Sequence, residues 1–484
     1  MISTRLLTPE QKNEILGQAY FYRSWFYFQI IKRYGGMPII DKVFEGGDDD
    51  IPRVTYHESH DWMMEDIQKA IYMLPDSWDD PNYGRPTKIA AMALKEWAQL
   101  FDASPLMQND LNSTENKGYD TERAKSAAKS AYEVIRYMDG SKSAPYPYGL
   151  ASKEEYTNVF YFKYPPVHQP EYIWVKRQFP NAANQNQKRT IRTFWQYEDL
   201  AFGSGPDGNS MCCPSLNIVN MFDKKGADGI YYPIDDPRSG YALDYAHKPF
   251  EDRDPRFYNN ILLPGTTWGH YADGRTYYIT TYKGGAAYQH MLTQKDCNKR
   301  MFTGFMCKKF MWPECNQYLE KNNPNCWWDY RFLTIYIRAS QIYLDYAEAL
   351  FEGCGSATAT IEGCPISAAE AINILRRRIG LTDLPSDIVA DPDKFRAAYR
   401  RERAVELMFE NHRWWDIRRW MILEETFKDT YPIKGALFTP RESNHGSITD
   451  KSTLTYDYEQ IDITPEVRSF TKKNYSVSYT HLTL

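Results

Sequence analysis

The sequence predicts an α-rich protein, mainly α with short strands, in which paired helices support one loop-rich, variable face. Two observations carry this prediction. Amphipathic helical patterns fill residues 8–138 and return over residues 332–424. Between them, residues 140–330 are rich in Gly, Pro, Asn and aromatic residues and keep no long helical period. Because helices bracket the irregular stretch, we expect one domain with an elaborated face rather than three separate domains.

Four helices are expected in the N-terminal part, each with start or stop signals. The first pattern covers 8–34 and ends at the glycines and the proline of "YGGMP". The second covers Tyr56–Met73, and the third covers Thr87–Ala103 with Thr87 as the expected N-cap. The fourth covers Thr121–Met138.

Small residues in the third and fourth patterns predict close helix pairs. Ala90 and Ala91 fall on one expected helix, and Ala127 and Ala128 fall on the next. Small side chains let two helix backbones approach closely. The arrangement is typical of antiparallel helix pairs such as tetratricopeptide-type repeats.

The irregular middle is expected to be functional. A stretch of nearly 200 residues without regular structure is rarely a linker inside a compact chain, and its aromatic content is too high for disorder. Short strands are expected, such as "YYITTY" at 277–282. Alternation would place Tyr278 and Tyr282 on one face of that strand and Tyr277 on the other.

Helical patterns return over Leu333–Phe351, Ser367–Ile379 and Lys394–Phe409. The last of them leads into an arginine- and tryptophan-rich stretch, "RRERAVELMFENHRWWDIRRW", at 400–420. Its helical spacing predicts local partners, namely the ion pairs Arg403–Glu406 and Glu410–Arg413 and cation–π pairs of Trp415 with Arg419 and of Trp414 with Arg418. "ENH" is expected to break the helix, with Asn411 as a possible cap. The stretch is therefore interpreted as part of the structural scaffold rather than as a nucleic-acid-binding site.

Composition limits the functional classes. The 484 residues carry a net charge of −5, whereas a dedicated nucleic-acid binder usually has a basic balance. The 38 Tyr, 23 Phe and 13 Trp make carbohydrate binding a natural candidate, since sugar rings have apolar faces that stack on aromatic rings. The alternative is a large aromatic core. No apolar run is long enough to span a membrane, and "MISTRLLTPEQK" is no signal peptide, so the start reads as cytoplasmic unless the chain is a fragment.

The cysteines and histidines do not predict a metal site. There are eight Cys and nine His, and no C-x-x-C pair occurs, so a zinc site is not expected. Cys354 and Cys364 flank the polar loop "CGSATATIEGC". A disulfide between them, suited to an oxidising compartment, and two free thiols are both open.

No catalytic motif appears, and no cofactor is expected. The acidic turn "GGDDDIP" at 46–52 lacks the alternating ligand spacing of a calcium loop and reads as a solvated loop. A glycoside hydrolase needs a positioned pair of carboxylates. The loop carboxylates do not define such a pair; they are Asp199, Asp207, Asp235 and Asp236.

Seven segments resemble, in order, the motifs of the SusD/RagB family of surface glycan-binding lipoproteins. They are 19–40, 84–106, 214–229, 251–265, 335–350, 400–420 and 464–475, and the third, fourth and fifth read "PSLNIVNMFDKKGADG", "EDRDPRFYNNILLPG" and "IYIRASQIYLDYAEAL". The resemblance implies four tetratricopeptide-like helix pairs that support a variable face. It implies a non-catalytic protein that binds oligosaccharides, or in some relatives peptides. It implies a SusC-like TonB-dependent transporter as partner, an outward-facing place on the outer membrane, and a lipid on an N-terminal cysteine.

The chain departs from this pattern at both ends. The "YGG" motif comes only 36 residues in, so we expect that roughly a hundred residues of the family pattern, including the lipid anchor, precede Met1. The single domain would then cover 1–475. Residues 476–484 read as a non-native tail, because Val477–Thr483 can be encoded by a transposon-end adapter used in sequencing libraries.

Family specificity lies in the variable loops, so the ligand residues must be inferred from this chain. Trp268 and Tyr271 follow a Gly-rich loop that cannot easily bury them, and they are the expected platform. Tyr288 would edge this platform, and Arg275 or Asp273 would hydrogen-bond sugar hydroxyls. The leading reading is a surface glycan-binding protein, against a peptide-binding member, a glycoside hydrolase and a structural adaptor. The sequence does not name the glycan.

Overall fold

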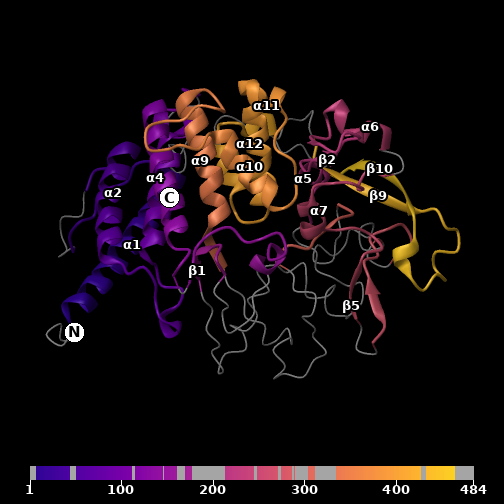
Figure 1. Cartoon of the computed structure of the whole chain (residues 1–484), viewed down its shortest axis with the longest axis horizontal. Coiled ribbons are helices and arrows are strands. Elements are labelled where there is room, and N and C mark those ends of the chain that lie inside the picture. The colour runs from indigo at the N-terminus through magenta and orange to yellow at the C-terminus, as the bar shows by residue number, and fades with distance from the viewer. Residues whose placement is uncertain are drawn as a thin grey trace.

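The computed structural model describes residues 7–43, 51–111, 115–144, 146–160, 169–176, 213–244, 248–270, 274–285, 288, 303–310, 334–426 and 432–463. It confirms an α-rich fold with short strands. Figure 1 shows α1, α2 and α4 on one side, α9 to α12 in the middle, and short helices with small sheets on the other side. No helix of the described part combines the length and the apolar character that crossing a bilayer requires.

The four N-terminal helices form where the sequence predicts them. They are α1 (Pro9–Tyr34), α2 (Tyr56–Met73), α3 (Lys88–Ala103) and α4 (Thr121–Gly140). Thr8 and Thr55 cap the first two helices through complete capping boxes, and the Thr87 hydroxyl accepts the N–H of Ala90 as expected. Each helix packs on the next, and the four predicted small residues of α3 and α4 are fully buried.

The "YGG" motif sets the turn from α1 to α2. Gly35 has a φ of 75°, a left-handed conformation that glycine adopts without strain. A Cβ on Gly36 would collide with the carbonyl oxygen of Val54. The guanidinium of Arg53 donates to the carbonyl of Gly36 at 2.8 Å and to that of Tyr34 at 2.7 Å. These contacts hold the segment from which α2 starts against the end of α1.

One predicted helix begins with a strand instead. Leu333–Phe351 was expected to be helical throughout, but Thr334–Arg338 forms strand β8, which pairs antiparallel with β1 (Tyr172–Lys176). The β-branched residues at 334, 335 and 337 favour this extended backbone. The helix α9 then covers Ala339–Cys354.

The second helical group continues with α10 (Ala368–Arg378), α11 (Ser386–Ala390), α12 (Pro392–Glu406), α13 (Arg413–Arg419) and α14 (Leu423–Thr426). α4 packs on α9, and α9 packs on α10 and α12, so the two helical groups form one continuous stack. Phe409 and Asn411 have φ values of 60° and 64°. These left-handed residues confirm the predicted helix break at "ENH".

The rest of the described chain forms two-stranded antiparallel sheets and short helices. The further sheets are β2 (Lys224–Lys225) with β3 (Tyr231–Tyr232), β4 (Ile261–Leu262) with β7 (Met306–Cys307), β5 (Thr267–His270) with β6 (Thr276–Tyr278), and β9 (Lys434–Pro440) with β10 (Tyr456–Asp462). The short α-helices are α5 (Leu216–Val219), α6 (Tyr241–Asp244) and α7 (Pro255–Asn260). Strand β6 stops at Tyr278, and Tyr277 and Tyr282 are both buried, so the predicted strand alternation through 277–282 is wrong.

The described residues form two hydrophobic cores that meet at β1 and α12. The first core lies among the long helices, and the second lies among the small sheets. Strand β1 gives Trp174 to the first core and Val175 to the second, while α12 gives Tyr399 to the first and Val405 to the second. These two elements therefore lie at the junction between the cores.

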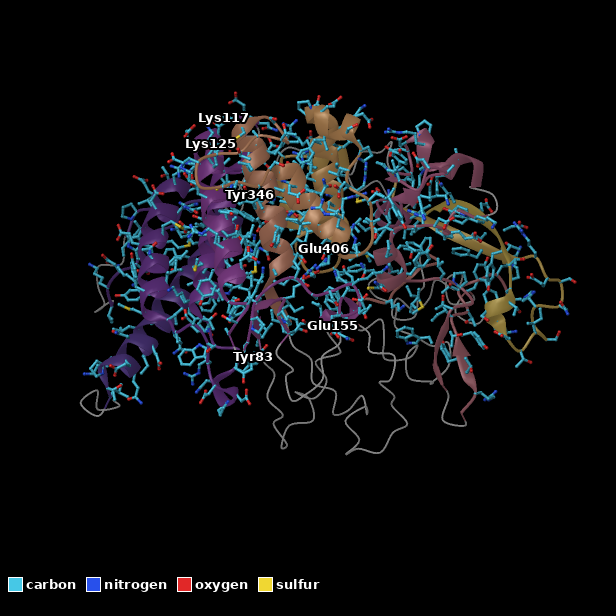
Figure 2. All side chains as sticks on the ribbon, viewed as in Figure 1. Tyr83, Lys117, Lys125, Glu155, Tyr346 and Glu406 are labelled. Atoms are coloured by element: carbon cyan, nitrogen blue, oxygen red, sulfur yellow. The ribbon has the colours of Figure 1, made fainter. Side chains whose placement is uncertain are left out.

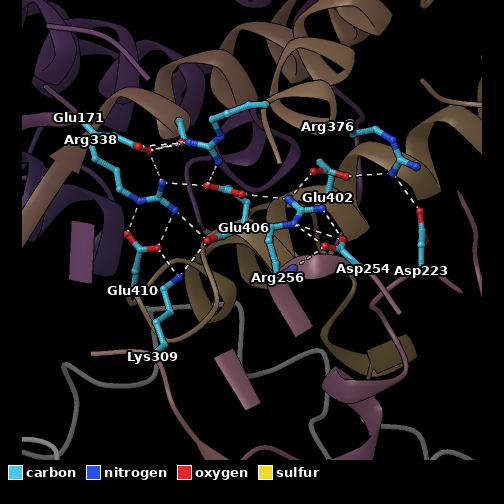
Figure 3. Close-up of polar contacts among 12 residues, drawn as sticks. Glu171, Asp223, Asp254, Arg256, Lys309, Arg338, Arg376, Glu402, Glu406 and Glu410 are labelled. Carbon is cyan, nitrogen blue, oxygen red and sulfur yellow. Dashed lines mark hydrogen bonds and ion pairs between the residues drawn. The ribbon is translucent and has the colours of Figure 1, made fainter. Parts of the chain in front are cut away.

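A buried ion-pair network fills this junction (Figure 3). Its members are Glu171, Asp223, Asp254, Arg256, Lys309, Arg338, Arg376, Arg378, Glu402, Glu406 and Glu410. Glu406 accepts from Arg256 at 2.9 Å, from Arg338 at 2.9 Å and from Arg378 at 2.7 Å. Burial alone would raise the pKa of Glu406, but these three guanidinium groups outweigh it and hold the pKa well below its usual range.

The arginine-rich stretch is part of the scaffold, as predicted, but its arginines also pair with carboxylates that are distant in sequence. Arg403 pairs with Asp345 and Asp416, not with Glu406, and Arg419 pairs with Glu348 and Asp416. The ring of Trp415 faces Lys32 and Arg33 of α1, not Arg419. The predicted local pairs Arg403–Glu406 and Trp415–Arg419 are therefore wrong. Burial explains this, because the side chains of Arg403 and Arg419 point into the fold, where other helices supply carboxylates.

Candidate functional site

An aromatic cleft opens beside the 74–87 connection between α2 and α3. It has a volume of about 530 Å³, within the range of small-molecule sites. Its described lining residues come from α1, the connection, β1 and β8, and they are Tyr22, Trp25, Phe26, Pro81, Asn82, Tyr83, Gly84, Arg85, Trp174, Val175, Lys176 and Tyr336. Figure 2 places Tyr83 at the lower edge of the helical part, away from Lys117 and Lys125 at its upper edge. We call this hollow the aromatic cleft.

Three packed rings from three elements form the floor of the aromatic cleft. The ring of Trp25 meets that of Trp174 edge to face, with centroids 4.8 Å apart and planes at 82°. Trp174 stacks on Tyr336 of the neighbouring strand at 4.6 Å and 28°. Such contacts add to the stability gained by burial and fix the ring orientations. The floor of the aromatic cleft therefore has its geometry fixed in the absence of a ligand.

Helix α1 supplies a more exposed edge. The ring of Phe26 is 60% exposed and that of Tyr22 is 38% exposed, although both residues are aromatic and lie on a long helix. Large rings that face solvent beside a hollow are typical of binding surfaces. Burial raises the pKa of the Tyr22 and Tyr336 hydroxyls. Both hydroxyls therefore remain neutral near pH 7 and can donate a hydrogen bond.

The 74–87 connection forms the opposite wall and is braced by its own hydrogen bonds. The indole N–H of Trp78 donates to the Pro86 carbonyl at 2.8 Å, and the Arg85 N–H donates to the Asn82 carbonyl at 3.1 Å. Gly84 has a φ of 94°, which glycine accepts readily. This turn presents Tyr83 and Arg85 on either side of the glycine at the aromatic cleft.

The charges at the aromatic cleft are positive. Among the lining residues that the structure describes, Arg85 and Lys176 are the charged ones, and none is Asp or Glu. Arg85 contacts the side-chain oxygen of Gln18 at 3.5 Å and lies over the Trp78 ring, so its guanidinium has no carboxylate partner within the described ranges. A cation without a carboxylate partner at the rim can donate several hydrogen bonds to a ligand.

This arrangement suits a flat ligand that carries many hydroxyl groups. Ring faces can pack against the apolar C–H faces of a sugar, while Arg85, Asn82 and tyrosine hydroxyls can hydrogen-bond its oxygens. A glycosidase would need two positioned carboxyl groups about the scissile bond. The described lining of the aromatic cleft offers none, and the described part of the chain holds no group of three metal-ligating side chains.

Three of the five residues predicted for the platform lie in the described structure, namely Trp268, Arg275 and Tyr288. The ring of Trp268 is 3% exposed and that of Tyr288 is 8% exposed, whereas Arg275 is exposed. Tyr271 and Asp273 lie outside the described residues. The expectation that the Gly-rich loop leaves Trp268 exposed is wrong, because β5 pairs with β6 and places this ring in the second core. A ligand-binding role for this set stays a prediction.

The possible disulfide is not formed, and both thiols are free. Cys354 ends α9, and Cys364 lies on a tight turn in which its N–H donates to the Ile361 carbonyl at 2.9 Å. Of the two alternatives that the sequence left open, the structure shows the free thiols.

The acidic candidates do not form a catalytic pair in the described structure. Asp236 is bound by Arg238, which also donates to Asp387. Asp199, Asp207 and most of the acidic turn at 46–52 lie outside the described residues.

Sequence reasoning missed the aromatic cleft, although α1 carried a usable signal. "YFYRSWFYF" at 20–28 places aromatic residues on every face of the helix. A helix that is apolar all round either buries all its faces or presents one to a ligand or partner. Trp174 and Tyr336 had no comparable signal, because their approach depends on the pairing of β1 with β8, which are more than 150 residues apart.

Comparison with family models gives two matches that together span most of the chain. The model of the SusD family matches residues 170–476, and a model described as "Starch-binding associating with outer membrane" matches residues 1–96. Comparison with curated proteins gives no match.

Solved structures share the fold. A SusD-like protein from Bacteroides fragilis superposes with a TM-score of 0.67 at 23% identity, over 98% of this chain and 78% of the other. A SusD-like carbohydrate-binding protein from the same organism has a TM-score of 0.61 at 21% identity, over 97% and 78%. A laminarin-binding SusD-like protein has a TM-score of 0.51 at 18% identity, over 88% and 74%.

Proposed function

Because this chain belongs to the SusD family, we propose that it binds oligosaccharides in its aromatic cleft, without catalysis, and passes them to a SusC-like TonB-dependent transporter for uptake. Membership makes it a SusD-like protein of a carbohydrate-binding family with an association to the outer membrane. The binding surface, the partner and the outward-facing location are the parts that we propose here.

The observation that carries this proposal is the make-up of the aromatic cleft. Tyr22, Trp25, Phe26, Tyr83, Trp174 and Tyr336 give it six aromatic side chains from four separate segments, in a hollow large enough for an oligosaccharide. Packing in a hydrophobic core would bury Phe26, yet this residue is 60% exposed. Proteins of the same fold include a laminarin-binding SusD-like protein and one solved with a xylogluco-oligosaccharide.

Affinity electrophoresis tests the binding proposal. The purified protein would be run through gels that contain laminarin, xyloglucan, starch or no polysaccharide. Retardation in at least one polysaccharide gel is expected, with unchanged mobility in the plain gel. Unchanged mobility in a broad panel of polysaccharides would contradict glycan binding and leave peptide binding, the alternative within the same family, as the reading to test next.

The non-catalytic proposal rests on the absence of Asp and Glu from the described lining of the aromatic cleft. Any polysaccharide that retards the protein would be incubated with it, and released reducing ends would be measured over time. No release above the blank is expected. Steady release that survives repurification would show turnover and would overturn this part of the proposal.

The transporter proposal rests on family membership and on the outer-membrane association that the second family description gives. An affinity-tagged protein would be isolated from outer membranes of the native organism in mild detergent. Co-purification of a TonB-dependent transporter is expected. Recovery of the protein without such a transporter, or in the soluble fraction of cells that express the full-length gene, would contradict this partner and this location.

A further inference from the structure

A second hollow, of about 400 Å³, is lined by the other end of the same 74–87 connection. Its lining residues are Asp76, Ser77, Tyr137, Gly140, Ser141, Ala144, Tyr146 and Tyr148. They come from the connection, from the end of α4 and from the loop after α4. We call it the tyrosine pocket. It shares no lining residue with the aromatic cleft, which the connection borders through residues 81–85.

The tyrosine rings of this pocket are held in place by specific hydrogen bonds. The Tyr137 hydroxyl donates to Oδ1 of Asp76 at 2.6 Å. The backbone N–H of Tyr148 donates to the Ser141 hydroxyl at 2.9 Å. Burial raises the pKa of both tyrosine hydroxyls, so both stay protonated and neutral. The pocket is thus formed in the absence of a ligand.

One ring of the pocket is partly exposed to solvent. Tyr137 and Tyr148 pack against the first hydrophobic core, but Tyr146 belongs to neither core and its side chain is 40% exposed. Gly140 leaves open space, since a Cβ there would meet no atom within 4 Å. The third ring therefore lines the hollow and is partly accessible from solvent.

The chemistry of the tyrosine pocket matches a neutral sugar. Three rings offer faces for the apolar side of a pyranose, and the Asp76 carboxylate and the serine hydroxyls offer acceptors for its hydroxyl groups. No Lys or Arg is among the lining residues, although the Lys88 ammonium lies 6.0 Å from the centroid of the Tyr137 ring. We propose that the tyrosine pocket is a second sugar subsite, which engages a separate part of a polysaccharide already held in the aromatic cleft.

This inference rests on the proposed glycan binding and adds a length dependence to it. A polysaccharide long enough to reach both hollows binds the second one intramolecularly, which raises its overall affinity. Loss of the tyrosine pocket should therefore lower the affinity for a long polysaccharide. The affinity for an oligosaccharide that fills only the aromatic cleft should not depend on the tyrosine pocket. The distinction separates a real subsite from a general disturbance of the fold.

The test compares Tyr146→Ala with a matched control, Tyr72→Ala. Tyr72 is also a tyrosine of the helical part, is 81% exposed and lines neither hollow. Isothermal titration calorimetry would use the polysaccharide selected from laminarin, xyloglucan and starch, and a trisaccharide of the same linkage. Loss of one stacking contact is expected to weaken polysaccharide binding by about threefold to tenfold. Trisaccharide affinity should stay unchanged, and Tyr72→Ala should change neither.

Each outcome of this comparison either supports or overturns the second subsite. Equal effects of Tyr146→Ala and Tyr72→Ala on the polysaccharide would overturn the second subsite while leaving the aromatic cleft intact. Equal weakening of the polysaccharide and the trisaccharide would overturn it as well, because the pocket would then not be separate. If the unmodified protein binds none of the polysaccharides, the proposed function fails and the second subsite fails with it. Gly140→Trp, which fills the hollow and leaves every tyrosine in place, should reproduce the effect of Tyr146→Ala.

Discussion

The indole rings of Trp25 and Trp174 meet edge to face with their centroids 4.8 Å apart, although the two residues belong to a helix and a strand that are far apart in sequence. This contact joins α1 to β1, and Tyr336 extends it to β8. The aromatic cleft is therefore built on the same packing that closes the first hydrophobic core. A ligand here would rest on rigid elements, which hold binding groups more accurately than loops do.

Arg85 is expected to supply the charged hydrogen-bond donor at the aromatic cleft. Replacement by Met keeps much of the side-chain volume but removes every donor. Affinity for the glycan should fall by about threefold to tenfold, the usual net contribution of one hydrogen bond. Arg136→Met, on the exposed surface of α4, is the control and should leave the affinity unchanged. Equal affinities for both variants by calorimetry would remove Arg85 from the site.

Glu406 is expected to be a main determinant of stability. Glu406→Gln removes the one buried carboxylate that Arg256, Arg338 and Arg378 share, and breaking such a buried ion pair is typically destabilising by about 3 to 5 kcal/mol. Glu370→Gln, which disturbs the exposed pair with Arg377, should cost less than about 1 kcal/mol. Chemical denaturation would give both values, and a similar loss for the two variants would contradict the role of the buried ion-pair network.

Because the same network lies between the two cores, we also propose that residues 1–475 behave as one domain. A single calorimetric unfolding transition is expected for the unmodified protein. Two well-separated transitions would show that the cores unfold independently.

Acid should destabilise the protein through the same network. Burial opposes ionisation of Glu406 and Glu410, but the neighbouring arginines and Lys309 outweigh it and hold the pKa values of both carboxyl groups below their ordinary range in the folded state. The stability that these carboxylates add is complete above the unfolded-state pKa, about 4.3 for Glu. It is lost as the pH falls below that value towards the folded-state pKa. Thermal melts between pH 7 and pH 3 should show this loss of stability, and the loss should be smaller for Glu406→Gln than for the unmodified protein. An equal dependence of the melting temperature on pH in the two proteins would contradict the role of Glu406.

Much of the scaffold was predictable because helix signals are local. The capping threonines, the "YGG" stop and the small residues of α3 and α4 all act within a few residues of their position. The partners of Arg403 and Arg419 were not predictable, since the sequence shows only neighbours at helical spacing while the fold brings carboxylates from α9. Strand β8 was read as helix for the same reason, because its pairing partner lies more than 150 residues away.

The candidate site was less predictable than the scaffold. A Gly-rich loop suggested that Trp268 is exposed, but strand pairing buries it in the second core. The aromatic cleft instead uses residues of motifs that resemble the family scaffold, such as Trp25 and Tyr336. A single sequence cannot separate a ring that packs from a ring that lines a hollow, since both occur at the same helical or strand spacing.

Free thiols are expected at Cys354 and Cys364. Without reductant, a maleimide probe should label both after unfolding, as peptide mass mapping would show. In the folded protein Cys354 should react first, because Cys364 is buried and its burial raises the pKa of the thiol. Labelling of neither cysteine in denaturant, followed by labelling of both after reduction, would establish the disulfide instead.

The central claim is that the aromatic cleft is the glycan-binding surface, and Phe26 tests it most directly. Its ring lines the cleft and is 60% exposed, so Phe26→Ala should leave the thermal stability unchanged. Ile30→Ala, one helical turn further along α1 and outside the cleft, is the control. Calorimetric titration with the bound glycan should show a loss of affinity of about tenfold for Phe26→Ala and none for Ile30→Ala. An unchanged affinity of Phe26→Ala would contradict the assignment of the aromatic cleft as the binding site.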